Sequence, residues 1–256
     1  MAKLTKAQAK AHQQACDLLA KDVLTDDDKL FVLENWQESA KHINTIAGAF
    51  FTPPGLARDF CIETYGPRII DLCAGIGALS LRALWHHEAV EIVCVELNPE
   101  YVEVGKKLLP EATWVVGSVF DLPNLGHFDC AIGNPPFGAT PRQAKAPRYT
   151  GNDFEYHVID IASGIADYGV FIVPQMSAPF CYSGHPCFEV RESDKYRRFV
   201  DQTGIKLTPN CGIDTSVYAN DWHGVSVAVE IVTADFAEAR ERRQPSQANL
   251  FMEAAE

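Results

Sequence analysis

The stretch Phe128-Asp-Cys-Ala-Ile-Gly-Asn-Pro-Pro-Phe-Gly138 decides how the chain is organised. Its first part, residues 128–132, is a short and mostly apolar run, which is typical of a buried strand. The run ends at Asn134, because the two prolines that follow cannot continue a hydrogen-bonded ladder and turn the chain out of the sheet. An amide, a free backbone carbonyl and an aromatic ring are therefore expected together at one strand end. In open α/β sheets, ligands bind at this end of the strands.

The groups at this turn suit chemistry on an exocyclic amino group of a nucleobase. Such a nitrogen is a poor nucleophile because its lone pair is delocalised into the ring, and two acceptors on its N–H groups would localise that pair. The side-chain oxygen of Asn134 and the backbone carbonyl of Pro135 could be those acceptors, while Phe137 could stack on the ring. The base would have to leave its helix to enter such a pocket. The alternative is a proline turn that only ends a strand.

Asn134-Pro135-Pro136-Phe137 after an apolar strand resembles the catalytic motif of S-adenosylmethionine-dependent amino-methyltransferases, chiefly the adenine-N6 enzymes. The resemblance extends over roughly residues 48–234. It implies that the four residues of the motif are catalytic, that the cofactor is S-adenosyl-L-methionine and that no metal is needed. It also implies an α/β fold of the class I methyltransferase (Rossmann-like) type, with a seven-stranded, mostly parallel sheet and helices on both faces.

A second stretch, Asp71-Leu-Cys-Ala-Gly-Ile-Gly77, joins a predicted strand to a predicted helix. Strand, glycine turn and helix form the general nucleotide-binding arrangement. Gly75 and Gly77 allow the backbone to approach a ligand that side chains would block. Asp71 ahead of the glycines would repel a pyrophosphate, and Ser80 stands where the dinucleotide fingerprint has its third glycine. Both features favour S-adenosylmethionine over a dinucleotide.

Acidic residues after the next two predicted strands complete the expected cofactor site. Glu96 ends the second strand, 25 residues after Asp71, where its carboxylate can accept both ribose hydroxyls; otherwise it is a solvated strand end. The resemblance implies that Asp121 meets the adenine amino group, whereas its bare chemistry is also that of a turn aspartate. It further implies that a Phe-x-Thr-Pro-like segment upstream contacts the methionine end. The residues expected to bind the cofactor are Phe51, Thr52, Pro53, Asp71, Cys73, Gly75, Gly77, Glu96, Leu97, Asp121 and Asn134.

Composition excludes several classes of protein. The 256 residues carry a net charge of −12, which argues against a basic nucleic-acid coat but not against an enzyme with a local basic cleft. No run approaches the ~18 apolar residues of a membrane span, and the N-terminus lacks the apolar core of a signal peptide. We therefore expect a cytoplasmic protein without membrane contact. Eight scattered cysteines without a Cys-x-x-Cys pair indicate reduced core thiols, and the group Cys181, His185 and Cys187 matches no common zinc pattern.

The chain divides into three predicted parts. Residues 1–47 form an N-terminal helical cap, residues 48–236 form the catalytic domain, and residues 237–256 form a flexible, charged tail. Within the catalytic domain, the loop 138–153 carries the cations Arg142, Lys145 and Arg148. In an acidic protein, three cations beside the proposed pocket could bind phosphates of a flipped strand. An ordinary solvated loop is the alternative.

These patterns predict a site-specific DNA adenine-N6 methyltransferase. Only the loops 138–153 and 175–190 remain for sequence recognition, because predicted helices and strands occupy most of the chain after Asn134. A compact RNA adenine-N6 methyltransferase, guided by RNA shape, is therefore the main alternative. A protein glutamine methyltransferase is less favoured, although the same motif can hold a side-chain amide. An inactive cofactor-fold protein that only binds a partner is disfavoured by the intact motif.

The tail contains a short motif of its own. Gln247, Leu250 and Phe251 form the pattern Gln-x-x-Leu-Phe, which resembles the peptide by which bacterial replication proteins dock on the sliding clamp. Adjacent apolar side chains in a mobile tail are typical of peptide docking. A clamp partner would bring the enzyme to newly made DNA. The alternatives are a chance match or a tail that folds back on the domain.

A peptide of residues 243–256 is expected to bind a bacterial sliding clamp with micromolar affinity, because Leu250 and Phe251 would fill an apolar pocket on the clamp. Fluorescence anisotropy of the labelled peptide measures this. The peptide carrying Leu250→Ala and Phe251→Ala should not bind. If neither the wild-type peptide nor the whole protein binds, the clamp is not a partner and its support for a DNA substrate is lost.

Overall fold

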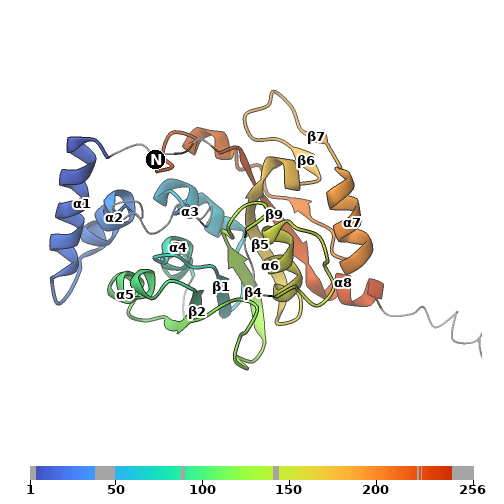
Figure 1. Cartoon of the computed structure of the whole chain (residues 1–256), viewed down its shortest axis with the longest axis horizontal. Coiled ribbons are helices and arrows are strands. Elements are labelled where there is room, and N and C mark those ends of the chain that lie inside the picture. Colours follow the sequence, from blue (N-terminus) through green and yellow to red (C-terminus); the bar gives the residue numbers. More distant parts are fainter. Residues whose placement is uncertain are drawn as a thin grey trace, which may run out of the picture.

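A seven-stranded sheet forms the centre of the computed structural model, which describes residues 4–37, 50–87, 90–140, 144–223, 225 and 227–243 (Figure 1). The strand order is β3-β2-β1-β4-β5-β9-β8. The first five strands are parallel, whereas β9 runs antiparallel to β5 and β8 antiparallel to β9. A separate hairpin pairs β6 with β7. The strands are β1 (Arg68–Leu72), β2 (Glu91–Glu96), β3 (Thr113–Val116), β4 (Phe128–Gly133), β5 (Ala166–Pro174), β6 (Phe180–Cys181), β7 (Glu189–Val190), β8 (Thr208–Pro209) and β9 (Val229–Asp235).

Helices cover both faces of this sheet, as the sequence predicts. Side chains of a strand alternate between its faces, so Ile69 of β1 joins one buried cluster and Ile70 joins the other. The first cluster lies under α1 to α5 and the second under α6 to α8. Within the described residues, three short 3-10 helices connect these elements. The helices are α1 (Lys6–Leu19), α2 (Asp26–Asn35), α3 (Pro54–Phe60), η2 (Cys61–Glu63), α4 (Ala78–His86), α5 (Pro99–Leu108), α6 (Phe154–Ala162), η3 (Gln175–Ser177), α7 (Asp194–Thr203), η4 (Thr215–Tyr218) and α8 (Phe236–Arg243).

The described part of the predicted cap, residues 4–37, consists of α1 and α2. Each helix begins with a capping box, formed by Thr5 with Gln8 and by Thr25 with Asp28. Trp36 follows α2 directly and is almost fully buried. The indole ring lies 5.7 Å from the ring of Phe51, so the cap packs on the segment that leads into the catalytic domain. Residues 38–47 of the predicted cap lie outside the described residues.

The end of the chain differs from its prediction. Residues 237–243 belong to helix α8 rather than to a flexible tail. Phe236 and Ala239 are fully buried, and Arg240 donates hydrogen bonds to Asp167 and to the carbonyl of Ala166. Buried residues at this three-residue spacing are a helical signal that the high charge of the segment conceals. The remaining tail, including the motif residues Gln247, Leu250 and Phe251, lies outside the described residues.

Two expectations from composition can be compared with the structure. All eight cysteines are free thiols, but only four are buried in the core, and Cys187 and Cys211 are exposed. Among the described residues, no helix has the length and apolar character that a membrane crossing requires. No group of three or more His, Cys, Asp or Glu side chains in that same part of the chain could hold a metal ion.

Replacement of Phe236 by alanine is expected to lower the free energy of unfolding by about 3–5 kcal/mol, because it leaves a cavity where α8 meets β5. Gly169 of β5 gives this ring its room, since a Cβ at that position would lie 2.5 Å from Phe236. Urea unfolding measures the change. The exposed Glu241 of the same helix supplies the control, and Glu241→Ala should change stability by no more than about 0.5 kcal/mol. Equal stability of the two variants would show that α8 is not part of the core.

Candidate active site

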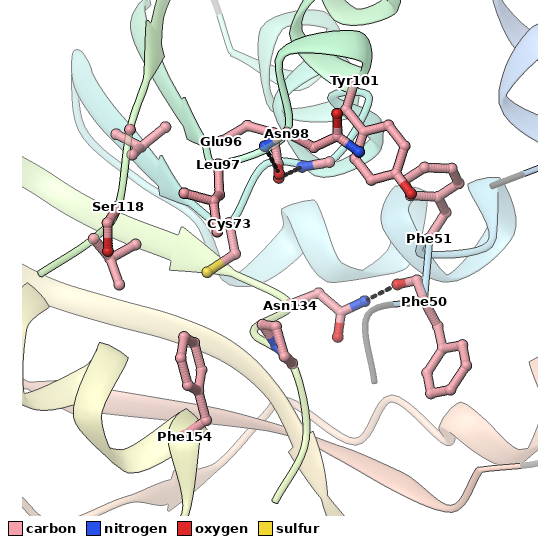
Figure 2. Close-up of a pocket in the computed structure, with 15 residues that line it drawn as sticks. Phe50, Phe51, Cys73, Glu96, Leu97, Asn98, Tyr101, Ser118, Asn134 and Phe154 are labelled. Atoms are coloured by element: carbon pink, nitrogen blue, oxygen red, sulfur yellow. Dashed lines mark hydrogen bonds between the residues drawn. The ribbon is translucent and has the colours of Figure 1, made fainter. Parts of the chain in front are cut away.

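A pocket lies at the carboxyl ends of β1 to β4 (Figure 2). It holds about 860 Å³ of empty space, counting the solvent in its open mouth. The structure brings six of the predicted cofactor residues to its wall, and Thr52 lines a smaller pocket beside it. These six residues are Phe51, Cys73, Gly75, Glu96, Leu97 and Asn134.

The glycine turn after β1 forms one side of this pocket. Cys73 adopts a φ of 83°, in the left-handed region that non-glycine residues rarely adopt. The backbone N–H groups of Cys73 and Ala74 both donate to the carbonyl of Val95 on β2, which holds the turn in this shape. Gly75 has a φ of 58°, and a Cβ there would lie 3.1 Å from the ring of Phe51. The backbone at Gly75 therefore lies directly against the ring of Phe51 in the wall of the pocket, with no side chain between them.

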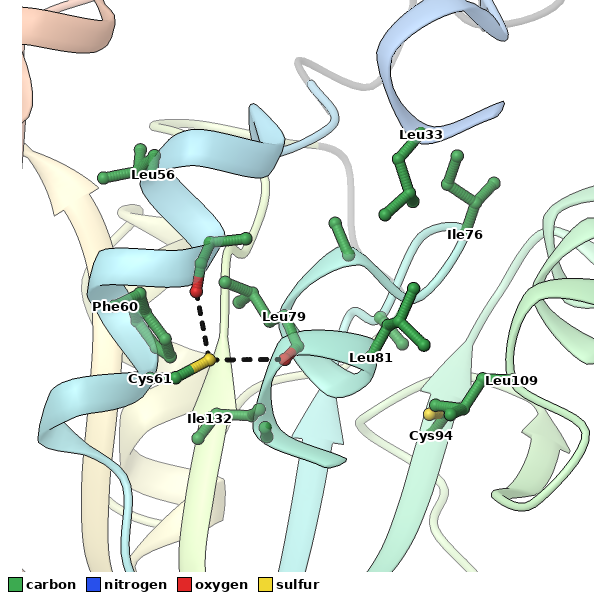
Figure 3. Close-up of a cluster of buried hydrophobic side chains, with 14 of the residues drawn as sticks. Leu33, Leu56, Phe60, Cys61, Ile76, Leu79, Leu81, Cys94, Leu109 and Ile132 are labelled. Atoms are coloured by element: carbon green, nitrogen blue, oxygen red, sulfur yellow. Dashed lines mark hydrogen bonds between the residues drawn. The ribbon is translucent and has the colours of Figure 1, made fainter. Parts of the chain in front are cut away.

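The same turn also contacts the helical cap. Ile76, between the two glycines, is buried and points toward Leu33 of α2 (Figure 3). On the other side of the pocket wall, Tyr101 of α5 packs edge-on against Phe51 and Trp36, with ring centroids 4.9 and 5.8 Å apart. The aromatic wall of the pocket thus depends on an element that precedes the central sheet.

Glu96 connects the glycine turn to β2. One carboxylate oxygen accepts from the backbone N–H of Gly75 at 2.8 Å and the other from the N–H of Asn98 at 2.8 Å (Figure 2). Burial raises the pKa of this carboxyl, whereas these backbone donors favour its ionised form. Each oxygen keeps a lone pair that a hydroxyl could use. Glu96 therefore has a structural role, and its contact with the ribose stays a prediction.

Asp71 lies beneath the turn, outside the pocket. The side chain is 0% exposed, and one oxygen accepts from Ser80 Oγ at 2.7 Å. Its other oxygen has no hydrogen-bond partner among the described residues. Burial raises the pKa of Asp71 to about 7. The serine in place of a third glycine is thus the partner of this aspartate, and Asp71 does not line the pocket.

Three other predicted cofactor residues also lie away from the pocket wall. Pro53 begins the segment leading into α3, Gly77 begins α4, and Asp121 is exposed. Ser118 occupies the position after β3 that we had assigned to Asp121. Ser118 directly follows Gly117 at the end of β3, and this position at a strand end could have indicated a pocket residue. The prediction favours Asp121 instead because of its charge. The wall residues that the sequence analysis missed are Phe50, Asn98, Tyr101, Gly117, Ser118, Val119 and Phe154, together with the core residue Val95.

The amide of Asn134 is held in a single orientation. Its Nδ2 donates to the carbonyl of Phe50 at 2.9 Å (Figure 2). It also donates to Thr52 Oγ1 at 3.0 Å. A carbonyl can only accept, so these contacts assign the nitrogen and direct Oδ1 away from them. Oδ1 is buried and has no hydrogen-bond partner in the described part of the chain. An unsatisfied buried acceptor costs about 1–3 kcal/mol, so this atom suits a ligand that brings a donor.

The rest of the motif is divided between pocket and core. Pro136 lines the pocket and Pro135 is buried. Phe137 is half-buried against the cluster beneath α1 to α5 and does not line the pocket, whereas Phe154 at the start of α6 does. Stacking of a base on Phe137 therefore stays a prediction.

The three predicted phosphate-binding cations have different positions. Lys145 is exposed, and Arg142 lies outside the described residues. Arg148 is instead bound to Asp160 of α6, with its Nε 2.7 Å from Oδ1, and also donates to Ser163 Oγ. Asp160 is fully buried and needs these donors. Arg148 therefore has a structural role, and its contact with a substrate phosphate stays a prediction.

Comparison with known proteins agrees with this architecture. Residues 58–147 match the family model described as "Methyltransferase small domain", which spans β1 to β4 and the Asn134 turn. No curated protein sequence matches the chain. A Listeria monocytogenes structure provisionally described as a class I S-adenosylmethionine-dependent methyltransferase is 14% identical, covers 91% of this chain and 81% of its own, and has a TM-score of 0.55. A Pyrococcus horikoshii structure provisionally described as an RNA methyltransferase is 20% identical, covers 82% and 96%, and has a TM-score of 0.50.

Numbered in chain order within the main sheet, the strands follow the order 3-2-1-4-5-7-6, which defines the class I methyltransferase fold. The chain thus has the class I methyltransferase fold, and its residues 58–147 match a methyltransferase domain, whose cofactor is S-adenosylmethionine. The pocket at the ends of β1 to β4 suits that cofactor, because bare backbone at Gly75 and the carboxylate of Glu96 face one end and Asn134 faces the other.

Glu96→Ala is expected to weaken S-adenosylmethionine binding by about 1.5–3 kcal/mol, because a charged acceptor is lost and the glycine turn loses its bond to β2. Isothermal titration calorimetry measures the affinity. The exposed Glu111 gives a control of equal charge change, and Glu111→Ala should bind the cofactor like the wild type. Unchanged affinity in Glu96→Ala would remove this residue from the cofactor site.

Proposed function

We propose that the protein methylates the exocyclic N6 amino group of adenine in DNA. One observation carries the proposal: the buried, unpartnered Oδ1 of Asn134 at the pocket, with both donors of the same amide already engaged. An amino group is a donor that could complete this atom's hydrogen bonding. A substrate that offers only acceptors could not do so.

The residues of the turn would act on the target by orientation. S-adenosylmethionine, when bound, supplies an electrophilic methyl group. Asn134 Oδ1 accepts one N–H of the target, and the carbonyl of Pro135 accepts the other, so the nitrogen lone pair is drawn out of conjugation with the ring. The amide cannot rotate away, because Phe50 and Thr52 hold its nitrogen. Holding two reactants in line in this way can supply roughly 7–11 kcal/mol of the barrier in the best cases.

The preference for DNA rests on the motif and on the tail. The Asn-Pro-Pro-Phe sequence resembles that of adenine-N6 enzymes, and Gln247, Leu250 and Phe251 would connect the enzyme to replicating DNA. With Arg148 bound to Asp160, phosphate contacts by loop 138–153 would come from Lys145 and Arg142. The Pyrococcus horikoshii neighbour shares the fold alone and does not decide between DNA and RNA.

The substrate is tested by transfer of a tritiated methyl group to matched pools of duplex DNA, RNA and protein, followed by analysis of the labelled nucleosides or amino acids. We expect N6-methyladenine in the DNA pool. N6-methyladenine in RNA alone, or methylglutamine in protein, would replace the proposed substrate by one of the two alternatives.

Asn134→Ala should lower the transfer rate by about 10²–10³-fold, because it removes an acceptor for the amino group. S-adenosylmethionine affinity should stay close to that of the wild type, whereas thermal stability should fall, because the variant also loses the hydrogen bonds from Nδ2 to Phe50 and Thr52. Single-turnover kinetics at saturating cofactor measures the rate. Activity within a few-fold of the wild type would show that Asn134 does not bind the target.

A further inference from the structure

A chain of hydrogen bonds connects α7 with the end of the catalytic turn, which comprises residues 134–137. It begins at Lys195, whose Nζ lies 2.9 Å from Ser177 Oγ on η3. Ser177 Oγ donates to Oε1 of Glu155 at 2.6 Å. Oε2 of Glu155 accepts from the backbone N–H of Gly138 at 3.0 Å. Because Gly138 follows the motif directly, the chain of bonds ends on the catalytic turn.

Gly138 is held by both of its backbone groups. While its N–H donates to Glu155, its carbonyl accepts from the N–H of Phe154 at 2.9 Å. Its φ of 73° lies in the left-handed region, which favours glycine. Pro135 and Pro136 have no N–H to donate, so the turn has few means of anchoring itself. The hydrogen bonds between Gly138 and α6 are therefore an important anchor for the end of the turn.

Glu155 is unusual for a glutamate because its side chain is completely buried. Its side chain is 0% exposed, and no ion pair among the described residues includes it. Burying a carboxylate without direct charge compensation is costly, so its two donors must support it. The ammonium of Lys195 acts on it only through the Ser177 hydroxyl, and Lys195 also contacts Asp153 Oδ1 at 3.0 Å.

We propose that Glu155 is a positioning residue for methyl transfer. It fixes the catalytic turn through Gly138, and through Ser177 and Lys195 it couples that position to η3 and α7, two elements beyond β5 (Figure 1). This inference rests on the proposed function, because it takes the turn to be the part that holds the target amino group.

The ionised form of Glu155 accepts from both donors, so protonation should disturb the turn. Burial raises the pKa of Glu155, and the neighbouring Asp153 raises it further, so this form is lost at a higher pH than for an ordinary glutamate. Lys195 opposes this by polarising the Ser177 hydroxyl. The titratable and charged groups that face Glu155 from the surrounding elements are Asp153, Lys195, Tyr149 and Tyr156.

Kinetics of two variants test the coupling. In Glu155→Gln, the amide could still accept from Gly138, but its nitrogen would face Ser177 Oγ, and the Ser177 O–H would lose the acceptor that Glu155 provides. We expect kcat to fall by about 10–100-fold, as for a small misplacement of reacting groups, with S-adenosylmethionine affinity within about twofold of wild type. The acidic limb of the kcat profile that belongs to Glu155 should disappear. In Lys195→Met it should move to higher pH, whereas the exposed Lys206→Met should leave the profile unchanged.

Hydrogen exchange tests the same contact without any methyl acceptor. The amide of Gly138 should exchange slowly in the wild type and faster in Glu155→Gln and Ser177→Ala, with the central strands equally protected in all three. Unchanged exchange at Gly138 would overturn the inference, and so would unchanged kcat and pH profile in an active enzyme. A wild type inactive on every acceptor would overturn the proposed function, while the exchange rates would still decide whether Glu155 fixes the turn.

Discussion

Buried and half-buried carboxylates that accept backbone N–H groups hold the loops at the carboxyl edge of this sheet. Glu96 fixes the glycine turn after β1, and Glu155 fixes the exit of the catalytic turn after β4. On the far side, Glu230 of β9 is fully buried and accepts from the N–H groups of Tyr182 and Ser183. Each of these three acids lies on a helix or strand, and each binds the backbone of a loop that has no regular secondary structure. Several negative charges of this acidic protein therefore serve its architecture, and the net charge of −12 is a poor guide to what the surface binds.

The side-chain amide of Asn134 joins two segments of the pocket wall that are far apart in the chain. Asn134 follows β4, yet its nitrogen binds the carbonyl of Phe50, which lies 84 residues earlier in the chain. This contact places the aromatic segment before α3 against the catalytic turn. The same contact leaves Oδ1 without a partner. The Asn134 side chain thus connects the two segments through its nitrogen and supplies an unpaired acceptor through its oxygen.

The predictable parts of this molecule are those with a local signal. The apolar run 128–132 before the two prolines locates β4 to within one residue, and the proline turn and the glycine turn do lie at neighbouring strand ends. The surroundings of charged side chains are harder to predict. Arg148 and Asp121 were judged by charge and by proximity in the chain, but Arg148 is bound to a buried aspartate twelve residues away and Asp121 points to solvent. Glu155 was missed because a helix-start glutamate has no feature that marks it as buried. The role of such a charged side chain depends on the partner that tertiary packing brings to it, and the local sequence does not show that partner.

The position of Trp36 has a thermodynamic consequence for the cap. Its ring packs on Phe51 and Tyr101, which line the cofactor pocket. If the pocket needs this wall intact, any ligand it holds binds the docked cap better than the undocked one. Linkage then requires that ligand to stabilise docking by RT ln(1 + [L]/Kd) at most. Local opening of α1 and α2 and the free cofactor concentration would become two measures of the same equilibrium.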